Sequence, residues 1–244
     1  MRLAPQSLRA RRTFAAVACT LVAVSTGMSM TACGAVGDGQ QLSSRAQLVD
    51  DLASRMSSAG SLTYTATYSL PRGASATIAQ AQDPVRAAYT YPAGKLVLTP
   101  EETADCRTQS RSTTCTLTPP PSPLGDPTTA LLSQIGSRGL IAPAMVISLF
   151  GAVALDDDTM VTQHDTTLSG EHATCLDVSN LSNAPSTSFS ACITTDGLLG
   201  SFEGTVAGNT IDVTLSQYES TVAADAFALP SDAATIDKRP RQTK

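Results

Sequence analysis

The chain has 244 residues, of which 42% are hydrophobic and 15% charged, and it contains no tryptophan. Beyond residue 33 it carries 12 Lys and Arg against 21 Asp and Glu, a formal net charge of −9. An acidic surface is repelled by phosphates, which argues against nucleic acid as a partner. The remaining residues, about 210, are enough for one domain with a buried core.

The first 33 residues have the layout of a bacterial lipoprotein signal peptide. Arginines precede an uncharged apolar run, Phe14 to Val24, which is shorter than the ~20 residues of a membrane-spanning helix. Met30-Thr31-Ala32-Cys33 resembles a lipobox with methionine in place of leucine. We expect residues 1–33 to form a lipoprotein signal peptide that ends at the lipobox cysteine. After cleavage Cys33 becomes the mature N-terminus, and its thiol carries a diacylglycerol anchor with acyl chains such as palmitate. An ordinary signal peptide cleaved nearby is the alternative.

Four further cysteines remain: Cys106, Cys115, Cys175 and Cys192. An even number in an exported domain predicts two disulfides, and four cysteines allow three pairings. The local pairing, first with second and third with fourth, is favoured because each pair brackets a strand, a polar turn and another strand. No C-x-x-C occurs and the histidines lie elsewhere, so we expect no metal site.

The first half of the domain predicts one helix followed by short strands. Residues 34–42 are Gly-rich and polar, typical of a flexible tether, and a single domain is expected over residues 43–230. A helix is predicted over about 45–56. Strict alternation over 62–70 predicts a half-buried strand, with Leu, Tyr, Ala, Tyr and Leu on one face. More strands are expected near 76–81, 86–91, 95–99 and 106–117.

A proline run at 119–123 separates the two halves, and helices are predicted after it. The first is expected to end near Ile135, and the second covers Ile141 to Leu155 with Pro143 in its first turn. The second is apolar nearly all round and should be buried. Strands follow near 173–179, 188–194, 198–206 and 211–215. Residues 231–244 are polar and are expected to form a disordered tail.

This order of elements favours an α+β fold, because no helix alternates with each strand as in a parallel doubly wound sheet. We expect a curved antiparallel sheet with an N-terminal helix and a central helical pair over its concave face.

The lipobox at Cys33, the helix-then-strand opening over 46–70, the central helices and the closing hairpins resemble the LolA-like exported carriers. Within these, the chain is similar to the mycobacterial LppX/LprG-type lipoproteins. The resemblance implies a half-open β-barrel that holds acyl chains under its helices, with the helix at 141–155 as a cover. The implied cavity residues are Tyr64, Tyr68, Leu96, Leu98, Met145, Leu149, Phe150, Ile211 and Val213.

Signals for catalysis are weak. Asp156, Asp157 and Asp158 lack the ligand spacing of an EF-hand, and a solvated turn is favoured over a calcium site. His164 next to Asp165, and Glu171 next to His172, point to opposite faces of a strand. No G-x-S-x-G, H-E-x-x-H or phosphate loop is present. We therefore expect no enzyme activity and no cofactor.

Two functions fit these features. The first is an exported lipoprotein on the extracytoplasmic face of the cell membrane that binds or carries a lipid or glycolipid in the cell envelope. The alternative is a surface-anchored interaction or sensor domain with a filled core and a protein partner. The carrier is preferred because of the buried helix and the curved sheet.

Overall fold

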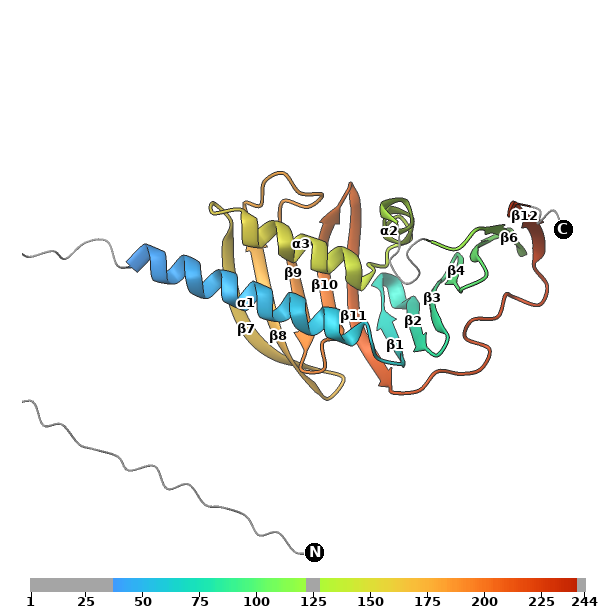
Figure 1. The fold of residues 1–244 in the computed structure, drawn as a ribbon, viewed down its shortest axis with the longest axis horizontal. Helices are drawn as coiled ribbons and strands as arrows, with labels where there is room; N and C mark the ends of the chain where they lie inside the picture. Colours follow the sequence, from blue (N-terminus) through green and yellow to red (C-terminus); the bar gives the residue numbers. More distant parts are fainter. Residues whose placement is uncertain (1–36, 122–127, 241–244) are drawn as a thin grey trace, which may run out of the picture. The chain divides into compact units, whose positions relative to one another are not determined.

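The computed structural model of the protein describes residues 37–121 and 128–240, with side chains from residue 44 on. In this part of the chain, twelve strands form one sheet in the order β12-β6-β5-β4-β3-β2-β1-β11-β10-β9-β8-β7 (Figure 1). Neighbouring strands are antiparallel, except that β12 runs parallel to β6. The strands are β1 (Tyr64–Ser69), β2 (Ser75–Gln82), β3 (Val85–Tyr91), β4 (Gly94–Leu98), β5 (Thr103–Gln109), β6 (Ser112–Thr118), β7 (Met160–Leu168), β8 (Glu171–Ser179), β9 (Phe189–Thr194), β10 (Leu199–Val206), β11 (Asn209–Glu219) and β12 (Ala234–Asp237).

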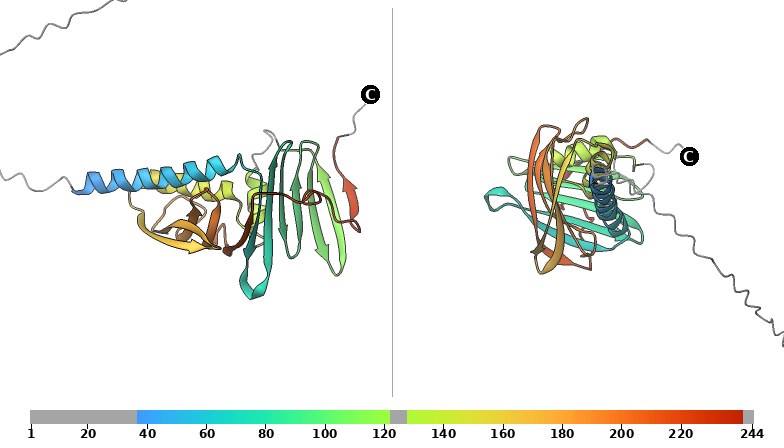
Figure 2. Two further views of the ribbon diagram at one scale, coloured as in Figure 1. Left: turned by 90° about the horizontal axis from the view of Figure 1, so that it is seen from below. Right: turned by 90° about the vertical axis from the view of Figure 1, so that its left-hand side faces the viewer.

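The helices of the described residues are α1 (Gly37–Ala59), α2 (Thr129–Gly136) and α3 (Pro143–Leu155), with a 3-10 turn at Pro71–Gly73. Helices α1 and α3 lie side by side over one face of the sheet, here called the inner face (Figures 1 and 2). The Arg45 guanidinium of α1 donates to the carbonyl oxygens of Asp156 (3.2 Å) and Thr159 (2.6 Å), directly after α3. These bonds join α1 to the C-terminal end of α3.

The expected fold class is wrong. The structure is mostly β, a twelve-stranded mixed sheet that is not closed into a barrel in the described part of the chain. The expected α+β fold, a half-open LolA-like barrel under a central helical pair, does not match it. The pairing of β1 with β11 joins two meanders into one long open sheet, with β12 and β7 at its edges. The helices in contact over the sheet are α1 and α3, whereas α2 is a separate short helix.

The inner face carries the main core of the protein. In β1 the side chains of Tyr64, Ala66 and Tyr68 are buried while the intervening threonines are half-buried, which confirms the alternation predicted there. The fully buried Phe202 ring of β10 stacks on Phe189 of β9, with ring centroids 5.6 Å apart. Phe189 in turn lies 6.2 Å from Phe150 of α3. These three rings connect the helical layer to the sheet.

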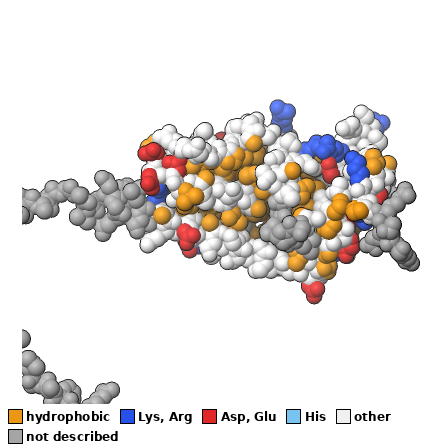
Figure 3. All heavy atoms as spheres, turned by 45° about the horizontal axis from the view of Figure 1, so that its top comes forward, with side chains coloured by type: hydrophobic (Ala, Val, Ile, Leu, Met, Phe, Trp, Pro, Cys, Tyr) orange, Lys and Arg blue, Asp and Glu red, His pale blue; other side chains and the backbone are white. Residues whose placement is uncertain are grey.

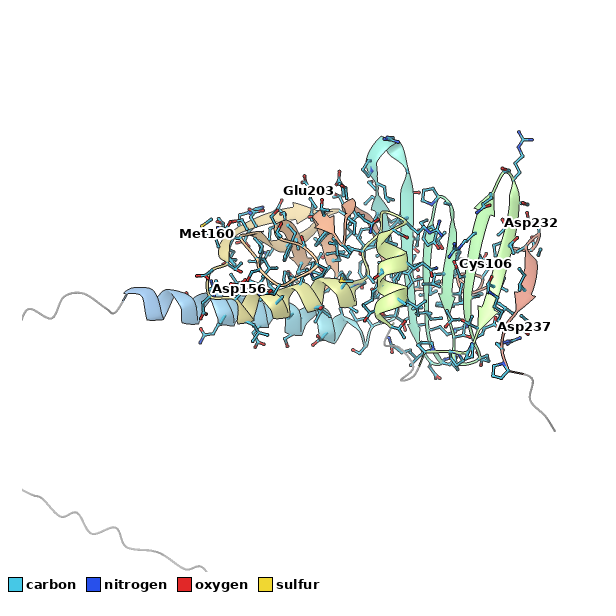
Figure 4. The ribbon with its side chains drawn as sticks, turned by 90° about the horizontal axis from the view of Figure 1, so that it is seen from above. Cys106, Asp156, Met160, Glu203, Asp232 and Asp237 are labelled. Atoms are coloured by element: carbon cyan, nitrogen blue, oxygen red, sulfur yellow. A yellow bond between two sulfur atoms is a disulfide. The ribbon has the colours of Figure 1, made fainter. Side chains whose placement is uncertain are left out.

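The opposite, outer face of β2–β6 is covered by residues 220–233, here called the C-terminal strap. Its Val222, Phe227 and Leu229 pack on small and medium side chains of the sheet, including Ala88 and Ala104. Arg86 lies over the Phe227 ring at 4.4 Å from the ring centroid. The Lys95 Nζ atom donates to the carbonyl oxygen of Ala228 at 2.8 Å. The strap leads into β12, the edge strand in which Figure 4 labels Asp237.

Two segments expected to be irregular contain regular secondary structure in their described parts. Helix α1 begins at Gly37, within residues 34–42 that were expected to form a flexible tether. Residues 231–244 were expected to form a disordered tail, but Ala234–Asp237 form β12. The Lys238 N–H also donates to the carbonyl oxygen of Leu117 at 2.8 Å, and Arg239 pairs with Glu102 at 2.6 Å. Backbone pairing to β6 orders this polar segment, which has little apolar side-chain signal of its own.

The structure confirms two disulfides, Cys106–Cys115 and Cys175–Cys192, the pairing that the sequence favoured. Each joins directly opposed residues of an antiparallel pair, β5 with β6 and β8 with β9, with Cα atoms 3.9 Å apart. All four cysteines are buried and lie on the outer face, away from the main core. The predicted lipidation site, Cys33, lies outside the described residues.

Candidate functional site

A cavity of about 550 Å³ lies where the C-terminal end of α1, the N-terminal end of α3 and the inner face of the sheet meet. Its walls come from six elements and the turns between them. The exposed residues Ser57, Ser61 and Val85 mark its mouth, whereas Met56, Tyr64 and Leu199 are almost fully buried. The lining residues are Met56, Ser57, Ala59, Gly60, Ser61, Tyr64, Gln80, Gln82, Val85, Tyr89, Pro143, Ala144, Ile147, Gly197, Leu198 and Leu199.

Local hydrogen bonds fix the α1 wall of this cavity. The end of α1 leaves backbone carbonyls without helical partners. The Gln80 amide nitrogen donates to the carbonyl oxygens of Gly60 (2.7 Å) and Leu62 (2.9 Å), and Gln82 donates to the same two (2.8 and 3.0 Å). The two glutamines therefore hold the helix end against β2, and their amide nitrogens are already used by the protein itself.

A second wall is formed by the turn between β9 and β10, which contains a glycine. Gly197, in the turn between β9 and β10, has a φ of +83°, and a Cβ atom there would lie 2.2 Å from the carbonyl oxygen of Arg55 in α1. Only glycine allows this turn to approach the helix so closely. The next residues, Leu198 and Leu199, then supply apolar wall, and the Tyr68 hydroxyl donates to the carbonyl oxygen of Leu199 at 3.0 Å. This hydrogen bond from Tyr68 of β1 holds Leu199, the wall residue on β10, in place.

The named lining contains no Asp, Glu, Lys, Arg or His side chain. Its two phenols, Tyr64 and Tyr89, stay protonated, because burial raises the pKa of both. Tyr89 reaches a pKa of about 12. For Tyr64 the neighbouring Tyr89 and Tyr218 add smaller upward contributions. The cavity is therefore electrically neutral over the physiological pH range, and its walls mix apolar side chains with uncharged serine, glutamine and tyrosine side chains.

This raised pKa predicts a loss of stability in alkali. The unfolded chain releases the Tyr89 proton near pH 10, whereas the folded protein retains it until about pH 12. The folded state therefore binds more protons between these values, and the free energy of unfolding falls there by about 3 kcal/mol for this residue. Denaturant titrations at pH 9 and pH 12 measure the decline, which should be smaller in Tyr89→Phe. An equal decline in both proteins would contradict the assignment.

Of the residues implied by the resemblance, only Tyr64 lines this cavity. The residues Tyr68, Leu96, Leu98, Leu149, Phe150, Ile211 and Val213 are buried in the main core instead. Met145 and Ile211 border a smaller space of about 10 Å³ beneath α2. The sequence reasoning missed the walls made by the end of α1, by Ala144 and Ile147, and by the turn after β9. The sequence signal that could have located these walls is the pair of glycines, Gly60 directly after α1 and Gly197 in the turn between β9 and β10.

Asp156 and His164, two of the acidic and histidine residues considered in the sequence, have structural contacts. Asp156, labelled at the end of α3 in Figure 4, accepts hydrogen bonds from the Ser182 backbone N–H (2.7 Å) and hydroxyl (2.6 Å). These bonds lower the pKa of the Asp156 carboxyl. The His164 Nδ1 atom pairs with Asp177 Oδ2 at 3.2 Å and not with its neighbour Asp165. In the described residues, one His/Cys/Asp/Glu group is close enough for metal ligation, His164 with Cys175 and Cys192.

Comparisons with known proteins leave this chain without an assigned family. No protein-family model matches it, and no curated protein sequence matches it. Among solved structures, it is similar to an uncharacterized conserved protein from Thermus thermophilus, with a TM-score of 0.47 and 12% sequence identity over 79% of this chain and 100% of that chain. Among the helices that the structure describes, none is long and apolar enough to cross a membrane.

Proposed function

We propose that the protein is an exported lipoprotein, anchored through Cys33, that binds an uncharged hydrophobic ligand in the cavity between α1, α3 and the sheet. The observation that supports this function is a cavity of about 550 Å³ whose walls combine apolar side chains with uncharged polar ones. Ligand sites in proteins commonly occupy about 300–1,000 Å³ and combine apolar walls with a few polar groups. The two disulfides support an oxidising, extracytoplasmic location.

The uncharged lining of the cavity determines which part of a lipid would bind there. A charged head group in this cavity would lose its water without meeting an opposite charge, which is costly. The phenols of Tyr64 and Tyr89 instead suit an ester, ether or hydroxyl oxygen, to which they can donate. The proposed function is therefore the carrier function of LppX/LprG-type lipoproteins, performed by a protein with a different fold. The apolar or uncharged portion of the ligand would occupy the cavity.

On the face seen in Figure 3, apolar side chains reach the surface at scattered places among polar groups. Exposed large apolar side chains in the described part include Leu155, at 89%, and Met160, at 59%. Isolated exposed apolar residues are common on protein surfaces. The cavity is therefore the more specific feature, and it favours ligand binding over the interaction-module alternative.

A bulky residue in the α3 wall should block binding. Ala144 is half-buried and lines the cavity, so Ala144→Phe places a ring in the space that a ligand would use. We expect this change to weaken binding of the neutral fluorescent probe N-phenyl-1-naphthylamine by about tenfold or more. The probe is titrated against the full chain carrying Cys33→Ser, and its fluorescence increase is recorded.

The matched control is Ser148→Phe, which adds the same side chain at an exposed position of the same helix, outside the cavity. It should bind the probe like the parent protein. Equal weakening in both variants would point to damage to α3 instead of a filled site. Saturable binding that both variants retain would place the probe elsewhere and contradict the proposed site.

A further inference from the structure

Three neighbouring strands bring a histidine and a cysteine pair together on the outer face. His164 of β7 is the direct cross-strand partner of Cys175 of β8, and Cys175 is the direct partner of Cys192 of β9. A ring nitrogen of His164 and the two sulfur atoms all lie within 4.8 Å of one another. The backbone register of the sheet, independent of the cavity on the inner face, creates this grouping.

The donor set is that of a thiophilic metal site once the sulfurs are reduced. Thiolate and imidazole are the usual ligands of Zn²⁺, at about 2.3 Å and 2.0–2.1 Å. Tetrahedral geometry at those lengths separates ligand atoms by about 3.6–3.8 Å. The three ligand atoms already lie within 4.8 Å of one another, and the two sulfurs must move apart after reduction to reach these values.

The environment of His164 resembles that of a metal ligand in one further respect. Its Nδ1 atom is 3.2 Å from Asp177 Oδ2, so the carboxylate orients the ring and leaves Nε2 available. A carboxylate partner of this kind is common behind zinc-bound histidines and strengthens the ligand. The His164 side chain is 49% exposed, which gives a metal ion access from solvent, whereas both cysteines are buried.

We propose that reduction of the Cys175–Cys192 bond turns this group into a binding site for a thiophilic divalent metal ion such as Zn²⁺. A dithiol reductant supplies two electrons and two protons, so that the protein S–S bond breaks, two protein thiols form, and the reductant becomes a disulfide. Metal binding then releases the two thiol protons. His164, Cys175 and Cys192 are three protein ligands, and the fourth position is left for water or another ligand.

The other disulfide provides a built-in control. Cys106 and Cys115 are also directly opposed on antiparallel strands, with the same Cα separation of 3.9 Å. In the described residues, however, no His, Asp or Glu completes a three-ligand group with them. Reduction of this bond should therefore create no comparable metal site, although it exposes the same number of thiols.

The test uses the full chain with Cys19 and Cys33 replaced by serine, so that four cysteines remain. The protein is reduced under argon with a water-soluble phosphine. The phosphine takes the oxygen atom of one water molecule and becomes a phosphine oxide, while the two hydrogen atoms of that water convert the disulfide into two thiols. The phosphine is removed and Co²⁺ is added as a spectroscopic probe. Cobalt–thiolate absorption and the metal content per chain are measured, with circular dichroism as the check on folding.

We expect one Co²⁺ per reduced chain, displaced by Zn²⁺, and none on the oxidised protein. Cys106→Ala/Cys115→Ala should retain binding, whereas Cys175→Ala/Cys192→Ala should lose it. Asp177→Asn should weaken binding by about 10- to 100-fold, and His164→Gln by at least as much. Binding that survives His164→Gln unchanged, or a reduced chain that binds no cobalt whether or not it folds, would overturn the proposal.

Discussion

A variant with all four disulfide cysteines replaced by alanine is expected to lose about 6 kcal/mol of unfolding free energy. The bridges close loops with sequence separations of 9 and 17, and in the chain-entropy model each contributes about 3 kcal/mol by restricting the unfolded chain. They lie between different strand pairs, β5 with β6 and β8 with β9, so their effects should add.

Denaturant titration of the two double variants and the quadruple variant measures these contributions separately. Each double variant should lose about half of the total. Because small domains are stable by only about 5–15 kcal/mol, the quadruple variant should be close to its folding limit. A quadruple variant as stable as the parent protein would show that the bridges do not restrict its unfolded state.

Phe202→Ala is expected to lower the free energy of unfolding by about 3–5 kcal/mol. Phe202 is fully buried, and its ring stacks on Phe189, which contacts Phe150 of α3. Removing it leaves a cavity at the junction of the sheet and the helical layer, where the rigid ring of Phe189 limits collapse. The change is measured by urea titration of the full chain carrying Cys33→Ser.

Phe227→Ala is the comparison for this change, since the same atoms are deleted from a half-buried ring on the outer face. Part of that ring is exposed, so less apolar area returns to water, and we expect less than half of the Phe202→Ala effect. A larger loss from Phe227→Ala would mean that the C-terminal strap, and not the inner-face core, dominates the stability of the protein.

Local features of this fold could be predicted from the sequence because short-range rules determine them. Period-two alternation identified β1, and Pro143 marked the first turn of α3. Cysteines on the polar faces of predicted strands indicated bonds that leave the main core closed, as observed. In each case, neighbouring residues in the sequence carry the information.

Long-range pairing could not be predicted in the same way. The choice between an open sheet and a half-open barrel depends on β1 pairing with β11, about 150 residues later, and alternation in the two strands is compatible with either arrangement. β12 is held by backbone pairing and has no apolar periodicity to reveal it. The cavity depends on the close approach of Gly197 to Arg55, which involves two distant segments.

The most direct test of the carrier function is mass spectrometry of an organic extract of the full chain carrying Cys33→Ser, purified without detergent from a related host. We expect an uncharged lipid, or a lipid with an uncharged apolar portion, in a near-stoichiometric amount. The Ser148→Phe variant should contain the same lipid and Ala144→Phe should be depleted of it. A folded parent protein whose extract contains no lipid, or equal amounts of lipid in both variants, would contradict ligand binding in this cavity.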